Sequence, residues 1–86
     1  MSAQWEIRFT KQARKDVEQL SPKLRAKLRD ILLEVLARNP YEGKKLFGDL
    51  AGSYSYGLTH KDRIVYSLDE ERQIIYIERA RTHYGD

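Results

Sequence analysis

The spacing of apolar residues changes at Pro40, and this change restricts the possible folds more than any other feature of the sequence. Before Pro40, apolar side chains recur every three or four residues along one helical stripe, at Leu24, Leu28, Ile31, Leu32, Val35 and Leu36. Because proline disfavours helix in the residue before it, this helix is expected to end at Asn39. After Pro40 the sequence continues as a loop with three glycines, followed by strand-like segments.

The residues before this helix predict one strand and another helix. Residues 4–9 (QWEIRF) alternate strictly between apolar and polar side chains, which is typical of a half-buried strand. Thr10 offers an N-cap hydroxyl for a helix over residues 11–20. Ser21 and Pro22 are suitable as the N-cap and first residue of the next helix, because proline lacks only an N–H that would be unpaired there. A helical hairpin is therefore expected after the first strand.

Three further strands are expected after the loop. They cover residues 53–59, 63–68 and 73–79 or slightly beyond, with short connections at residues 60–62 and 69–72. The element order β-α-α-β-β-β predicts an α+β fold, in which the N-terminal strand and helical hairpin pack on a mostly antiparallel four-stranded sheet. At 86 residues the chain is expected to form one domain, residues 1–86, with a shallow surface groove as its site.

Several classes of function lack their sequence signals. The chain has no cysteine, and its two histidines are far apart, so neither a zinc site nor another metal site is expected. No glycine-rich phosphate loop and no GxSxG elbow is present, and we expect no cofactor. No apolar run approaches the roughly 20 residues of a membrane span. These absences lead us to expect a soluble, cytoplasmic protein that does not bind a membrane.

The formal charge of +3 is unevenly distributed along the chain. Residues 1–42 contain nine Lys and Arg against six Asp and Glu, whereas residues 43–86 contain seven of each. A basic domain of this kind is compatible with a polyanionic partner, but also with no nucleic-acid binding at all. The basic excess of the helical half also suits an acidic partner chain.

The last predicted strands bring together residues that can act on phosphate. Because the start of one antiparallel strand faces the end of its neighbour, Arg63, Arg81 and His83 are expected to converge. Histidine can carry a proton in either direction near neutral pH, and arginine binds phosphate bidentately. Such a set suits metal-free cleavage of RNA by its own 2′-hydroxyl. Taken singly, Arg63 also fits a surface strand end, and His83 fits a solvated terminus.

The sequence resembles a known family in the stretches NPYEGKKLFGDLAGSYS and HKDRIVYSLDEERQIIYIERARTHY. The pieces P-x-E-G-K, L-x-G-x-Y, R-I-V-Y and the final H-Y, in this order and at these spacings, are similar to the RelE/ParE superfamily of toxin–antitoxin toxins, closest to its YoeB-like and RelE-like branches. The resemblance implies a RelE-like fold and a ribosome-dependent mRNA endoribonuclease, silenced by a cognate antitoxin. Its expected partners are that antitoxin, the ribosome and mRNA.

Residue roles follow from the same resemblance, position by position. Arg63 matches the phosphate-stabilising arginine, His83 the residue that acts as acid or base, and Tyr84 the adjacent aromatic, and these three are the expected catalytic residues. The expected RNA-binding residues are Lys44, Lys45, His60, Lys61, Arg79 and Arg81.

The general base is unassigned, because the chain departs from the family pattern in this loop. The loop is shorter than in YoeB-like toxins, so that Glu42 and Asp49 are only stand-ins for their glutamate, and His60 is another candidate. The second predicted strand has Ser55 and Gly57 where RelE-like toxins carry cations. Two alternatives therefore stay open: a ParE-like inhibitor of DNA gyrase, and a catalytically silent module that binds an antitoxin.

Overall fold

The computed structural model describes residues 4–80 of the chain. Its elements in chain order are β1 (Glu6–Phe9), α1 (Lys11–Glu18), α2 (Pro22–Ile31), a π-helical turn (Leu32–Leu36), a 3-10 turn (Pro40–Glu42), β2 (Lys44–Lys45), a second 3-10 turn (Gly48–Leu50), β3 (Ser53–Gly57), β4 (Arg63–Asp69) and β5 (Ile74–Ala80). None of the helices in this part of the chain is long and apolar enough to cross a membrane.

Both helices begin at the caps that the sequence predicts. The Thr10 hydroxyl accepts a hydrogen bond from the Ala13 amide at 3.1 Å, and the Ser21 hydroxyl accepts one from the Leu24 amide at 3.2 Å. The predicted helix up to Asn39 is α2 continued by the π-helical turn, in which the Ala37 amide donates to a carbonyl five residues back, at 2.8 Å.

The sheet has one strand more than the sequence analysis expected. Its five strands follow the order β1-β5-β4-β3-β2, with β1 parallel to β5 and all other pairs antiparallel. The mostly antiparallel α+β fold is thus confirmed, but the count of four strands was wrong. Lys44 and Lys45 pair with Ser55 and Tyr54 as the short edge strand β2. A two-residue strand made of lysines is hard to recognise from sequence, although short, lysine-bearing strands are usual at sheet edges.

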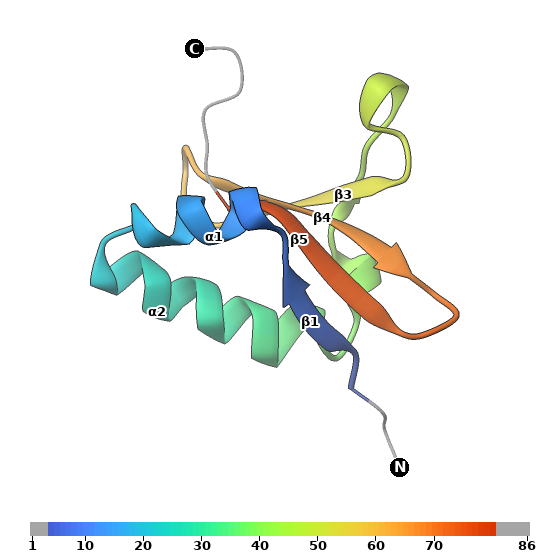
Figure 1. Cartoon of the computed structure of the whole chain (residues 1–86), viewed down its shortest axis with the longest axis horizontal. Helices are drawn as coiled ribbons and strands as arrows, with labels where there is room; N and C mark the ends of the chain where they lie inside the picture. The colour runs from blue at the N-terminus through green and yellow to red at the C-terminus, as the bar shows by residue number, and fades with distance from the viewer. Residues whose placement is uncertain (1–3, 81–86) are drawn as a thin grey trace.

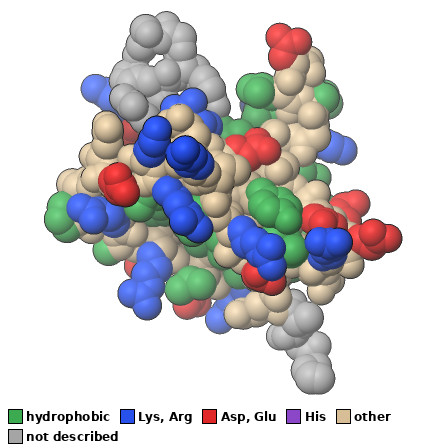
Figure 2. Space-filling model, viewed as in Figure 1, with side chains coloured by type: hydrophobic (Ala, Val, Ile, Leu, Met, Phe, Trp, Pro, Cys, Tyr) green, Lys and Arg blue, Asp and Glu red, His purple; other side chains and the backbone are tan. Residues whose placement is uncertain are grey.

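The two helices cover one face of the sheet and leave the other face open (Figure 1). The core lies between the helices and the sheet, where Leu36, Ile64, Tyr66, Ile75 and Ile77 are fully buried. We call the side of the sheet away from the helices the open face. In the view of Figure 2, Lys and Arg side chains gather over α1 and α2, as the uneven charge of the sequence predicts.

Candidate functional site

A row of directly paired residues crosses the open face of the sheet. Lys44 of β2 pairs with Ser55 of β3, Ser55 with Val65 of β4, and Val65 with Arg79 of β5. Directly paired residues in antiparallel strands share a face, so all four side chains belong to the open face. The two cations are exposed at the ends of the row, and Ser55 and Val65 are buried between them.

Arg63 lies beside this row, at the first position of β4. Its Nε donates a hydrogen bond to the Ser55 hydroxyl at 2.6 Å. Within residues 4–80, no carboxylate lies within ion-pair distance of the Arg63 guanidinium. Ser55 therefore orients the guanidinium without neutralising it, and leaves its terminal nitrogens for an anionic ligand.

A hollow of about 370 Å³ opens next to Arg63. It is lined by three polar residues, Lys44, Ser55 and Arg63, and by two apolar ones, Leu46 and Leu50. The hollow therefore offers two cations to an anionic group and two leucines to an apolar one.

Tyr66 fixes the loop that precedes Lys44. Its buried hydroxyl donates to the Pro40 carbonyl at 2.6 Å and accepts from the Gly43 amide at 3.1 Å. Burial raises the pKa of Tyr66 to about 12, so the phenol stays neutral and keeps its proton for Pro40. A Cβ at Gly43 would overlap the Tyr66 hydroxyl, which explains why the backbone here needs glycine. The P-x-E-G-K and R-I-V-Y segments are therefore in direct contact, and this contact sets the place of Lys44.

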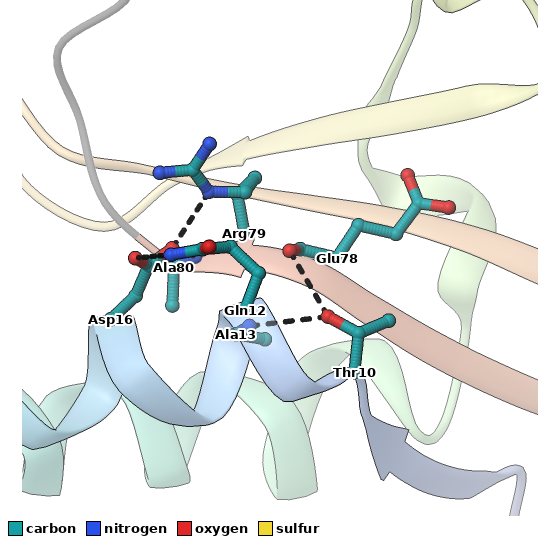
Figure 3. Close-up of polar contacts among 7 residues, drawn as sticks. All are labelled: Thr10, Gln12, Ala13, Asp16, Glu78, Arg79 and Ala80. Carbon is teal, nitrogen blue, oxygen red and sulfur yellow. Dashed lines mark hydrogen bonds and ion pairs between the residues drawn. The ribbon is translucent and has the colours of Figure 1, made fainter.

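A buried carboxylate holds the end of β5. The Asp16 side chain is only 1% exposed. It accepts hydrogen bonds from Arg79 Nε at 2.8 Å, the Ala80 amide at 3.1 Å and Gln12 Nε2 at 3.1 Å (Figure 3). Burial by itself raises the pKa of Asp16, but these three bonds outweigh burial and lower it overall. Asp16 is therefore ionised in the folded protein.

The position of Asp16 follows from where β1 ends. Because β1 stops at Phe9, the outer edge of β5 has no strand neighbour beyond Ile77. The Thr10 amide donates to the Ile77 carbonyl at 3.0 Å, and the Thr10 hydroxyl donates to the Glu78 carbonyl at 3.3 Å. Asp16 then accepts from the Ala80 amide, so side chains continue the hydrogen bonding that β1 no longer provides.

The structure brings some of the predicted site residues together and separates others. The pairing of Ile64 with Ala80 confirms that the end of β5 faces the start of β4. Lys44 joins Arg63, whereas Lys45 follows Lys44 in an extended strand and so belongs to the opposite face. His60 and Lys61 are exposed in the turn before Arg63.

The predicted residues Arg81, His83 and Tyr84 lie outside the described part of the chain. Of the two acidic stand-ins for a base, Glu42 accepts a hydrogen bond from Asn39 Nδ2 at 3.4 Å, and Asp49 belongs to the exposed turn Gly48–Leu50.

Three residues at this site were not recognised as site residues from the sequence. The sequence marks Ser55 only as a position without a cation, whereas in the structure its hydroxyl orients Arg63. Asp16 occupies the apolar stripe of α1, three residues after Ala13, and a charged residue in such a stripe is a signal for a buried ion pair. Glu78 accepts a hydrogen bond from the Ser53 hydroxyl at 3.1 Å. No sequence pattern indicated that contact.

Comparisons with known proteins identify the family of this chain. A family model described as the ParE-like toxin of type II bacterial toxin–antitoxin systems matches residues 7–85. Toxin RelG of Mycobacterium tuberculosis is 33% identical over 75 residues, which are 86% of this chain and 85% of RelG.

Solved structures of toxins have the same fold. The toxin–antitoxin complex RelBE2 from Mycobacterium tuberculosis contains a chain that is 31% identical with a TM-score of 0.84, covering 93% of this chain and 99% of that one. The YoeB–YefM complex from Staphylococcus aureus contains a chain that is 31% identical with a TM-score of 0.76, covering 95% of this chain and 100% of that one. The resemblance noted in the sequence is confirmed: the chain belongs to the ParE-like toxin family of type II toxin–antitoxin systems, within the RelE/ParE superfamily.

Proposed function

We propose that this toxin is a ribosome-dependent endoribonuclease that cuts mRNA in the ribosomal A site and so inhibits translation. The observation that carries the proposal is the Arg63 guanidinium, oriented by the neutral Ser55 hydroxyl at 2.6 Å beside the hollow that Lys44 also lines. A cation with no carboxylate partner in the described residues is suited to a phosphate group that gains charge during the reaction.

The proposed reaction uses the 2′-hydroxyl of the RNA as nucleophile. A base takes the hydroxyl proton, the 2′-oxygen bonds to the adjacent phosphorus, and the 5′-oxygen leaves with a proton from an acid. In this scheme Arg63 stabilises the phosphate, His83 transfers a proton and Tyr84 contacts the neighbouring base. These steps need no metal ion, since cationic side chains supply the positive charge.

The proposed RNA-binding residues divide into two groups. Lys44 lines the hollow, and His60 and Lys61 are exposed in the turn that leads into Arg63, so that all three suit contact with the RNA backbone. Arg79 is paired with Asp16, and Lys45 belongs to the other face, so we expect weaker contributions from both. Arg81 stays a candidate from its place in the sequence.

We also propose that a cognate antitoxin binds this toxin, as in the related complexes RelBE2 and YoeB–YefM. An apolar groove of about 330 Å³ lies between β1 and the helices, lined by Ile7, Phe9, Val17, Arg25, Leu28, Arg29, Leu32 and Leu33. Its two arginines suit an amphipathic segment with acidic residues beside an apolar face. The toxin would then act in the cytoplasm, where ribosomes translate mRNA.

Primer extension tests the proposed activity. Purified protein is incubated with an mRNA, with and without translating ribosomes, and the wild type is compared with His83→Ala. Cuts that require both ribosomes and His83 are the expected result. A folded protein that inhibits growth without cutting mRNA would contradict the proposal and support the DNA gyrase alternative. A folded protein that neither inhibits growth nor cuts mRNA would support the alternative of a catalytically silent module that binds an antitoxin.

A further inference from the structure

Strand β5 contains one extra residue relative to β4, and that residue is Glu78. Val65 pairs with Arg79 while the next residue of β4, Tyr66, pairs with Ile77, so Glu78 has no partner in β4. Such a β-bulge turns side chains out of the regular alternation and is common next to active sites. The bulge therefore raises the question of where the Glu78 carboxylate lies.

The Glu78 carboxylate lies on the open face. The Ser53 hydroxyl donates to Glu78 Oε1 at 3.1 Å, and Ser53 pairs with Ser67 of β4 on that face. The Glu78 side chain therefore reaches across β4 toward β3. Figure 3 shows its carboxylate pointing away from α1, while the Glu78 carbonyl accepts from Thr10. The side chain is half-buried, so that it remains accessible from the open face.

Two serines place this carboxylate next to Arg63. Ser53 contacts Glu78, and Ser55 contacts Arg63. Positions two apart on one strand share a face and lie about 7 Å from each other. An oriented carboxylate and an oriented guanidinium are thus neighbours on the open face. Cleavage by the 2′-hydroxyl requires this arrangement, because the hydroxyl and the phosphate that it attacks belong to the same nucleotide.

Asp16, Asp62 and His60 are less suitable as a base. Asp16 is buried and already accepts three hydrogen bonds. Asp62 accepts from the Thr59 hydroxyl at 2.9 Å within its own turn, and His60 is exposed in that turn. At Glu78, the hydrogen bond within residues 4–80 engages Oε1 and leaves Oε2 for a substrate proton.

We propose that Glu78 is the general base of the reaction, an inference that rests on the proposed nuclease function. Glu78 Oε2 accepts the proton of the ribose 2′-hydroxyl, and the 2′-oxygen forms a bond to the adjacent phosphorus. The bond from phosphorus to the 5′-oxygen breaks, and this oxygen takes a proton from the acid of the proposed reaction. Arg63 balances the charge on the phosphate, and Ser53 orients the carboxylate.

The test measures single-turnover cleavage of mRNA on saturating, programmed ribosomes. It compares the wild type with Glu78→Gln, with Ser53→Ala, and with Glu71→Gln, a control that makes the same charge change in the exposed β4–β5 turn. Glu78→Gln should lower the rate by about 10²-fold or more, the usual contribution of a general base. Ribosome binding and the melting temperature should stay at wild-type values. Ser53→Ala should lower the rate by less than Glu78→Gln does, because the carboxylate remains but is less well oriented. Glu71→Gln should retain the wild-type rate.

Each other outcome contradicts the proposal in a distinct way. A wild-type rate for Glu78→Gln would exclude Glu78 as the base while leaving the nuclease function intact. Equal rate losses in Glu78→Gln and Ser53→Ala, together with equally lowered melting temperatures, would show that the contact is structural. No cleavage by the wild type would remove the nuclease function and this inference together. If Glu78→Gln melts early, Glu78→Ala and Glu78→Asp replace it. Glu78→Ala should lose the rate that Glu78→Asp partly retains, and a wild-type rate for Glu78→Ala would exclude Glu78 as the base.

Discussion

Arg63 and Arg79 belong to neighbouring strands and to the same face of the sheet, but their partners differ in charge. Arg63 Nε donates to the neutral Ser55 hydroxyl at 2.6 Å, whereas Arg79 Nε donates to the ionised Asp16 carboxylate at 2.8 Å. A hydroxyl orients a guanidinium and leaves its charge for a ligand, while a carboxylate satisfies that charge within the fold. The acceptor, and not the arginine, therefore separates a binding residue from a structural one.

Replacing Arg63 should have the largest effect of the changes considered. Arg63→Ala should lower ribosome-dependent cleavage by roughly 10² to 10³-fold, because one oriented group that stabilises transition-state charge is lost. The free energy of unfolding should hardly change, because the Arg63 side chain is exposed. Single-turnover primer extension and urea denaturation measure the two quantities.

Two controls sharpen this result. Arg72→Ala removes an exposed arginine from the β4–β5 turn and should leave cleavage unchanged. Arg63→Lys retains the charge but not the bidentate geometry, so partial activity is expected. If Arg63→Ala cleaves normally and Arg79→Ala does not, the roles assigned to the two arginines are reversed.

Replacing Asp16 should have the next largest effect, which is a loss of folding stability. Asp16→Ala leaves the Ala80 amide, part of a fully buried residue, without its acceptor, and should lower the free energy of unfolding by about 2–3 kcal/mol. Arg79→Ala should cost only about 1 kcal/mol, because the Arg79 side chain is 45% exposed and solvent weakens its ion pair. Urea denaturation of both single variants and the double variant gives their coupling energy. Additive losses would contradict a direct Asp16–Arg79 interaction.

Features that depend on neighbouring residues, such as helix caps and strand starts, could be predicted from the sequence. Side-chain partners that are distant in the sequence could not. Thr10 and Ser21 were recognised as helix caps because a cap is defined by residues within one turn. The apolar run after Arg63 predicts that this residue begins a strand, as it does in β4. The partner of Arg63 is eight residues away on another strand, and that of Arg79 is 63 residues away on α1. Likewise, the bulge that turns Glu78 toward Ser53 exists only in the pairing of β5 with β4.

Tyr66→Phe should have a smaller effect. It tests whether the contact of Tyr66 with Pro40 and Gly43 holds Lys44 in place beside Arg63. The change leaves the Pro40 carbonyl and the Gly43 amide without their partner, and should cost about 1–2 kcal/mol of stability. Because Lys44 follows Gly43, RNA cleavage should also weaken, whereas the Asp16 contacts should be unaffected. Thermal melting and cleavage assays measure both effects. Full activity at lower stability would show that Lys44 does not depend on this anchor.

The smallest expected effect is that of pH. Acid should weaken the contact of Arg79 with Asp16 and leave the contact of Arg63 with Ser55 intact. The pKa of Asp16 is lower in the folded protein than the usual aspartate value of about 3.9, so folding favours the ionised form. Its contribution to stability is therefore complete above that value and is lost as the pH falls through the lower, folded pKa. Urea denaturation is measured from neutral pH down to pH values below about 3.9. The free energies of unfolding of wild type and Asp16→Asn should differ at neutral pH and become equal in acid. Ser55→Ala should differ from wild type by the same amount throughout, because its hydroxyl does not titrate. A constant difference for Asp16→Asn would mean that the Asp16 carboxylate does not stabilise the fold through its charge.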